Sequence, residues 1–307
     1  MSKVIIGIHG MANKPARAVH RDGWMKSMQE GLSNNSAVLA APPGALDADG
    51  FADVYWADLM YPVPSDKDEP YIAAKPGALK AYKDSFLEDL RVQLQGGLGW
   101  TADRVKATIG FDPLGDAVLE ARLKDLALYY DEARTIAGRN GGQRLTRHVL
   151  QDELIRVIRA HQGKDILLIA HSMGSIIAYD VLRRLGQEDH GIRVSHLVTN
   201  GSPLGLPHVK LKVEKFHAEG VYGDATLRTP TLVGKSWVNF ADPKDPVAFD
   251  THLGDDFWPN SNGVCVRDVF IRNDYELNGK RNPHKIYGYL RAPEFSKHLN
   301  DFLLDRL

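Results

Sequence analysis

The stretch DILLIAHSMG, residues 165–174, is the most informative part of this 307-residue chain. Its apolar run, residues 166–170, is bounded by polar residues and predicts a short buried strand. Ser172 follows almost at once, so the strand presents a serine at its end. Small and apolar residues then recur at helical spacing, with the small ones first: Gly174, Ala178, Val181 and Leu185. The stretch therefore predicts a strand, a sharp turn and a helix that lies close against a sheet.

Small residues stand two positions before and two positions after Ser172. A turn that lifts a nucleophile clear of the backbone between a strand and a helix is strained, and it crowds those two positions. Ala170 and Gly174 occupy them, so the chain reads Ala-x-Ser-x-Gly, one methyl group away from the Gly-x-Ser-x-Gly nucleophile elbow. We interpret Ser172 as a nucleophile; the alternative is an ordinary turn serine that caps a helix.

The composition is that of a globular protein with a sizeable core, since 43% of the residues are apolar. The 38 basic and 39 acidic residues leave a formal net charge of -1, so nothing in the overall charge draws the chain toward nucleic acid. The single cysteine, Cys265, excludes an internal disulfide and a cysteine-rich zinc site. No histidine pair has the spacing of a zinc hydrolase helix, and we expect neither a metal nor a cofactor.

The amino-terminal apolar run, residues 4–8, is far shorter than the apolar region of a signal peptide. No stretch approaches the ~20 apolar residues of a membrane span. We therefore expect no integral membrane segment and a cytoplasmic location. The oligomeric state is left open by the sequence.

Apolar runs alternate with helical patterns along most of the chain. Strands are expected at residues 4–8, 54–59, 166–170, 194–199, 235–240 and 264–271. Helices are expected at about residues 16–32, 150–158, 174–185 and 293–304. This alternation predicts one α/β domain over residues 1–307, a mainly parallel sheet with helices on both faces.

Two segments interrupt the alternation. Residues 65–144 are charged and mostly helical in pattern, and we interpret them as an insertion that forms a helical lid or cap. Between Gly205 and Gly234, apolar residues alternate with charged ones at Val209, Leu211 and Val213. A period of two predicts an edge strand or a hairpin there.

A serine hydroxyl needs a base within hydrogen-bond reach and a carboxylate that orients the base. Open α/β sheets place such groups in the loops after their later strands. Asp242 and Asp245 follow the strand expected at 235–240, and either is a candidate acid. His284 follows the last expected strand in a loop and is the strongest candidate base, because His298 falls within the final helix.

With these motifs the chain resembles the α/β-hydrolase superfamily, and more narrowly its lipase- and esterase-like serine hydrolases. The resemblance rests on His9-Gly10-Met11, the elbow around Ser172, Asp245-Pro246-Val247 and Asn282-Pro283-His284, which together span nearly the whole chain. It implies an α/β-hydrolase fold with the triad order Ser, Asp, His. In that order Ser172 is the nucleophile, Asp245 the acid and His284 the base, with Asp242 as the alternative acid. The backbone N–H groups of Met11 and Met173 are the implied oxyanion hole.

The expected function is that of a serine hydrolase that cleaves a small-molecule carboxylic ester through an acyl-serine intermediate. An acyltransferase, a thioesterase or an amidase would use the same triad. A non-catalytic hydrolase-like scaffold that binds a ligand or partner is a further alternative. The sequence does not identify the natural substrate, because the residues that determine substrate specificity lie in the two irregular segments.

Overall fold

The core of the molecule is a six-stranded parallel sheet with the strand order β2-β1-β5-β6-β7-β8. The structure is a computed structural model that describes residues 2–39, 41–83, 127–188, 191–219 and 226–307. The strands are β1 (Lys3–Ile8), β2 (Phe51–Val54), β5 (Asp165–His171), β6 (Val194–Asn200), β7 (Val233–Ala241) and β8 (Val266–Phe270). The predicted parallel sheet is confirmed.

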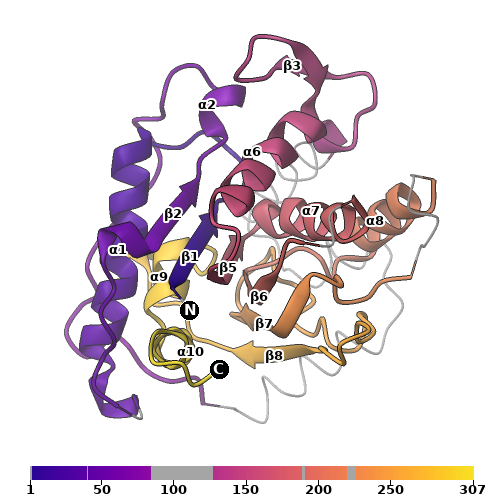
Figure 1. The fold of residues 1–307 in the computed structure, drawn as a ribbon. Coiled ribbons are helices and arrows are strands. Elements are labelled where there is room, and N and C mark those ends of the chain that lie inside the picture. Colours follow the sequence, from indigo (N-terminus) through magenta and orange to yellow (C-terminus); the bar gives the residue numbers. More distant parts are fainter. Residues whose placement is uncertain (1, 40, 84–126, 189–190, 220–225) are drawn as a thin grey trace.

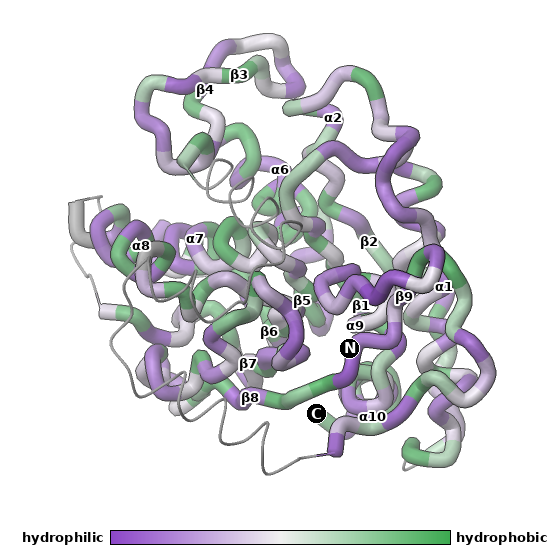
Figure 2. Tube along the Cα trace, turned by 180° about the vertical axis from the view of Figure 1, so that it is seen from behind, coloured by the Kyte–Doolittle hydropathy of each residue, from purple (hydrophilic) through white to green (hydrophobic). Residues whose placement is uncertain are grey.

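Helices cover both faces of this sheet (Figure 1). On one face lie α1 (Arg17–Asn34), α9 (Ile286–Arg291) and α10 (Pro293–Leu303), which pack on Ile5, Leu167 and Val238. On the other lie α6 (Thr146–Ala160), α7 (Met173–Glu188) and α8 (Pro207–Glu219), which pack on Ile6 and Leu168. Side chains of successive strand residues thus pack into the hydrophobic cores on opposite faces of the sheet. Figure 2 shows the same elements from behind, coloured by the hydropathy of each residue.

The second strand lies earlier in the chain than predicted. The strand expected at residues 54–59 is wrong, because β2 ends at Val54 and Ala57–Met60 form the short helix α2. Register explains the difference: Phe51 pairs with Ile5 and Val54 with Ile8, so β2 ends where β1 ends. The apolar residues that follow are buried beneath the loop after β1 instead of in the sheet.

The edge strand or hairpin predicted from Val209, Leu211 and Val213 is also wrong, because these residues lie in α8. Val209 and Val213 are four residues apart and buried, whereas Leu211 is 66% exposed. One apolar face at helical spacing therefore explains the pattern. Pro207 stands at the start of the helix, where proline is well tolerated.

The helical lid predicted over residues 65–144 falls largely outside the described residues. Its first described part, residues 65–83, is an arm without helix or strand. Its last part forms a small hairpin of β3 (Thr135–Ala137) and β4 (Gln143–Leu145), which leads into α6. A second small hairpin, β9 (Glu276–Leu277) and β10 (Lys280–Arg281), precedes the loop that carries His284.

Candidate active site

Ser172 stands on a strained turn between β5 and α7, as the sequence predicts. Its φ of +54° lies in the left-handed region, which is costly for a residue with a side chain. Its N–H donates to the Asn200 carbonyl at 3.1 Å, and its carbonyl accepts the Ser175 hydroxyl at 2.6 Å. The Ser175 hydroxyl also contacts that of Ser202 at 2.7 Å. These bonds hold the strained backbone in place.

The small residues beside Ser172 are required by close packing. A Cβ at Gly174 would lie 2.7 Å from the His9 carbonyl oxygen and 2.8 Å from that of Ile8. A Cβ at Gly10 would lie 3.0 Å from Ser172 Oγ. The first turn of α7 and the loop after β1 are therefore in direct contact, and that loop lies against the serine hydroxyl.

Asp245 and His284 form a buried hydrogen-bonded pair. His284 Nδ1 lies 2.7 Å from Asp245 Oδ2 and 2.9 Å from Oδ1. A carboxylate only accepts, so the proton sits on Nδ1, and a neutral imidazole then carries its lone pair on Nε2. The Val247 N–H donates to Asp245 Oδ1 at 2.9 Å and fixes the carboxylate. The side chain of Asp245 is fully buried and that of His284 only 8% exposed.

Asp242, the alternative acid, is engaged elsewhere. Its Oδ2 lies 2.5 Å from Arg281 and accepts the Asn273 N–H at 2.8 Å. Its Oδ1 accepts the Lys244 N–H at 2.8 Å. Burial raises the pKa of Asp242, and the Arg281 guanidinium acts in the opposite direction. Of the two candidate acids, Asp245 is the one in contact with the histidine.

Two residues that the sequence did not indicate complete the surroundings of this pair. The Tyr289 hydroxyl donates to Asp245 Oδ2 at 2.8 Å and accepts the Asp242 N–H at 3.1 Å. Gly201 has a φ of +54°, and a Cβ there would lie 2.7 Å from Asp245 Oδ2. Gly201 follows β6 directly, so its position at a strand end was a usable signal. Tyr289 lies in a short apolar helix, and the sequence carries no signal that points to it.

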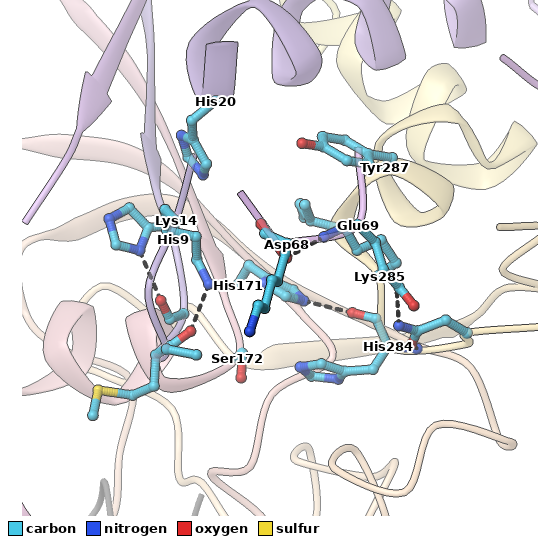
Figure 3. Close-up of a pocket in the computed structure, with 16 residues that line it drawn as sticks. His9, Lys14, His20, Asp68, Glu69, His171, Ser172, His284, Lys285 and Tyr287 are labelled. Carbon is cyan, nitrogen blue, oxygen red and sulfur yellow. Dashed lines mark hydrogen bonds and ion pairs between the residues drawn. The ribbon is translucent and has the colours of Figure 1, made fainter. Parts of the chain in front are cut away.

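His171 links the loop of His284 to the strand that carries Ser172. Its Nε2–H donates to the His284 carbonyl at 2.9 Å, and the two rings lie 4.7 Å apart. Ser172 and His284 line one cavity, and Figure 3 shows the His284 imidazole directed toward the Ser172 side chain. The three residues proposed from the sequence are therefore brought to one place.

The loop after β1 is held in one conformation by His9. Its Nδ1–H donates to the Gly10 carbonyl at 2.7 Å, and its Nε2 accepts the Trp56 N–H at 3.2 Å. Both ring nitrogens are thus used by a neutral imidazole, and burial lowers the pKa of His9 to about 3. Because the peptide is planar and trans, the Met11 N–H points away from the Gly10 carbonyl and so away from His9. Lys14 Nζ binds the Met11 carbonyl at 2.6 Å and fixes the next peptide.

Met173 carries the second N–H group that the sequence predicts for an oxyanion hole. It is the first residue of α7, and the first N–H groups of a helix have no partner within the helix. The helix dipole also favours negative charge at this end. Both Met11 and Met173 are buried and adjoin the cavity or its serine.

The cavity above Ser172 has a volume of about 290 Å³. Its charged lining residues are Lys14, Lys67, Asp68, Glu69 and Lys285. The arm forms one side of it: Asp68 pairs with Lys285 at 2.8 Å, and Glu69 accepts the Asn282 amide at 2.6 Å (Figure 3). Within the described residues, no three His, Cys, Asp or Glu side chains gather in a way that suits a metal ion.

Comparison with known proteins supports the fold. Residues 138–218, about a quarter of the chain, match the model of a family described as alpha/beta hydrolases of unknown function. The matched segment contains Ser172 and its flanking strand and helix, and it ends before Asp245 and His284. None of the curated proteins matches the chain. The sheet and the match together show an α/β-hydrolase fold.

No helix among the described residues is long and apolar enough to cross a membrane.

Proposed function

We propose that this chain, with its α/β-hydrolase fold, is a serine hydrolase that cleaves a carboxylic ester. One observation carries the proposal: His284, paired with the buried Asp245, shares a cavity with Ser172, which stands on a strained turn. In this assignment Ser172 is the nucleophile, His284 the general base and Asp245 the residue that orients and stabilises the histidine.

Acylation begins when His284 Nε2 takes the proton of the Ser172 hydroxyl. Oγ then attacks the ester carbonyl carbon, and negative charge develops on the carbonyl oxygen. The N–H groups of Met11 and Met173 are the proposed donors to that oxygen. Asp245 stabilises the imidazolium, which then protonates the leaving alcohol as the carbon–oxygen bond breaks.

Deacylation repeats these steps with water. His284 takes a proton from water, the hydroxyl attacks the acyl carbon, and the second tetrahedral intermediate collapses. The proton returns to Ser172 Oγ and the carboxylic acid leaves. Alcohols, thiols or amines in place of water would give acyl transfer, so product analysis with these competing acceptors separates a hydrolase from an acyltransferase.

The lining of the cavity favours a polar ester over a long apolar acyl chain. Charged side chains from the arm and from the loop of His284 form part of the lining of the described cavity. Lipid-type pockets are lined mainly by apolar side chains. We therefore propose a small polar ester as the substrate class.

A fluorophosphonate probe tests the nucleophile directly. Wild-type protein should be labelled covalently, and Ser172→Ala should abolish labelling, because the probe needs an activated serine hydroxyl. Ser236→Ala is a suitable control, since Ser236 lies in β7 and binds His196 away from the cavity. Labelling that survives Ser172→Ala would contradict the assignment. A folded wild-type protein that is never labelled would favour the non-catalytic scaffold.

A further inference from the structure

A basic groove adjoins the loop that carries His284. Two hollows of about 210 and 510 Å³ share Lys80, Arg272 and Arg281 in their lining. The arm, over residues 72–83, forms one side, and the loops that follow β7 and β8 form the other. We call these two hollows together the basic groove.

The carboxylates of the basic groove are each paired with a cation. The pairs are Asp242 with Arg281 at 2.5 Å, Asp274 with Arg291 at 2.7 Å and Glu276 with Lys75 at 2.7 Å. Lys80, Lys83 and Arg272 also line the groove and form no ion pair among the described residues. The groove therefore holds a local surplus of positive charge, although the whole chain has a net charge of -1.

Arg281 and the arm beside Lys80 and Lys83 are held in position, whereas the Lys80, Lys83 and Arg272 side chains are exposed. Arg281 is fixed by Asp242 and by the Asn273 carbonyl, which accepts its Nε–H at 2.9 Å. Tyr82, between Lys80 and Lys83, is anchored through its N–H to Glu294 at 2.6 Å, and its ring packs 5.4 Å from that of Phe270. Exposed cations on an anchored backbone stay close together, which favours an anion with several charges.

The groove is connected to the candidate active site through short paths. Arg281 precedes His284 by three residues, which a chain spans in about 11 Å at most. The Asp242 N–H, next to the carboxylate that holds Arg281, donates to Tyr289, and Tyr289 donates to Asp245. The groove and the cavity of Ser172 therefore adjoin: Arg281 lines the groove, and the next residue, Asn282, lines the cavity.

We propose that the basic groove binds the phosphate-bearing part of a soluble substrate, whose ester carbonyl is placed over Ser172. Three unbalanced cations suit two or more phosphate charges better than a single carboxylate. The larger hollow has room for a di- or triphosphate. This substrate class rests on the proposed function, whereas the binding of phosphate in the groove does not.

Binding is tested first with inorganic triphosphate, by calorimetry on wild-type protein and on Ser172→Ala. Both should bind it. The combined variant Lys80→Gln, Lys83→Gln, Arg272→Gln should weaken the affinity by roughly 10- to 100-fold, since three charges that attract the anion are lost. The matched control Lys164→Gln, Arg193→Gln, Lys212→Gln removes the same charge elsewhere and should bind like wild type. Equal affinity in the two triple variants, or no binding at all, would overturn the site. Binding to vesicles of anionic phospholipid without binding to free triphosphate would overturn the soluble ligand.

The substrate class is tested with two esters that differ only in a terminal phosphate about 10 Å from the carbonyl. Wild-type protein should have a roughly tenfold higher kcat/KM for the phosphorylated ester, and the groove variant should lose this preference while its rate on the neutral ester stays unchanged. Triphosphate binding without any preference would overturn the substrate assignment. Triphosphate binding without ester cleavage or fluorophosphonate labelling would instead mean that the proposed function fails and the anion site stands.

Discussion

Among the described residues, two buried histidine–aspartate pairs have similar distances but use different ring nitrogens. His284 Nδ1 lies 2.7 Å from Asp245, and His217 Nε2 lies 3.0 Å from Asp180. The first pair lies in the loops after the strands and shares a cavity with Ser172. The second lies between α7 and α8, away from the strand ends.

The other hydrogen-bond partners of Asp180 explain how the second pair differs from the first. Asp180 also accepts the hydroxyls of Tyr129 and Tyr130 at 3.0 and 3.1 Å, so three donors meet one carboxylate. Burial, and then the charge of Asp180, raise the pKa of both tyrosines well above the usual value, so they remain donors. This pair joins α8 and residues 129–130 to α7. A buried dyad is therefore no sign of catalysis by itself; its place beside a strained serine and a cavity is what distinguishes Asp245.

The largest effect is expected when the aspartates are neutralised one by one. Asp245→Asn should lower kcat/KM by roughly 10³- to 10⁴-fold, because the amide no longer stabilises the imidazolium. Asp242→Asn should change kcat/KM by less than roughly tenfold, since Asp242 supports Arg281 and backbone N–H groups. Steady-state kinetics on an ester provides the measurement. Similar losses in both variants would reject Asp245 as the acid.

The second pair should matter for stability and not for turnover. Asp180→Asn should lower the free energy of unfolding by about 2 to 3 kcal/mol, because an amide cannot satisfy three buried donors. Urea unfolding measures this, with Asp22→Asn on the exposed surface of α1 as the control. Activity per folded molecule should stay within roughly twofold of wild type. A loss like that of Asp245→Asn would mean that the second pair takes part in the chemistry.

His298 is a buried histidine that has no carboxylate partner among the described residues, and it should make stability depend on pH. Burial, with a smaller contribution from Arg267, lowers the pKa of His298 to about 3. Between pH 6.5 and about 3 the unfolded chain binds the proton that the folded protein refuses, so stability falls as pH falls through this window. From pH 7 to pH 5 this group should remove about 2 kcal/mol, and His298→Leu should abolish that part. Urea unfolding of both proteins at the two pH values gives the difference; identical pH dependence would contradict it.

Local patterns account for most of what was predicted correctly. The apolar run at residues 166–170 and the small residues around Ser172 determine a strand, a turn and a helix over ten positions, and such short-range rules transfer directly. β2 was misplaced because its register depends on pairing with β1. α8 was mistaken for a strand because alternation over five residues does not exclude a helix whose apolar residues lie four apart.

The site divides in the same way. Ser172 and His284 carry local signals, a turn motif and a loop position after the last strand. Asp242 and Asp245 share one loop, so only tertiary packing decides which of them meets the histidine. The Tyr289 hydroxyl reaches Asp245 across 44 positions of the chain, and such contacts leave no periodicity in the sequence.

The left-handed backbone at Ser172 lowers the stability of the fold at the residue proposed as the nucleophile. An L-residue in this region costs on the order of 1 to 2 kcal/mol, a penalty that glycine escapes. The free energy of unfolding is therefore lower with serine at position 172 than it would be with glycine there. A serine at this position is thus kept although its replacement by glycine would stabilise the protein.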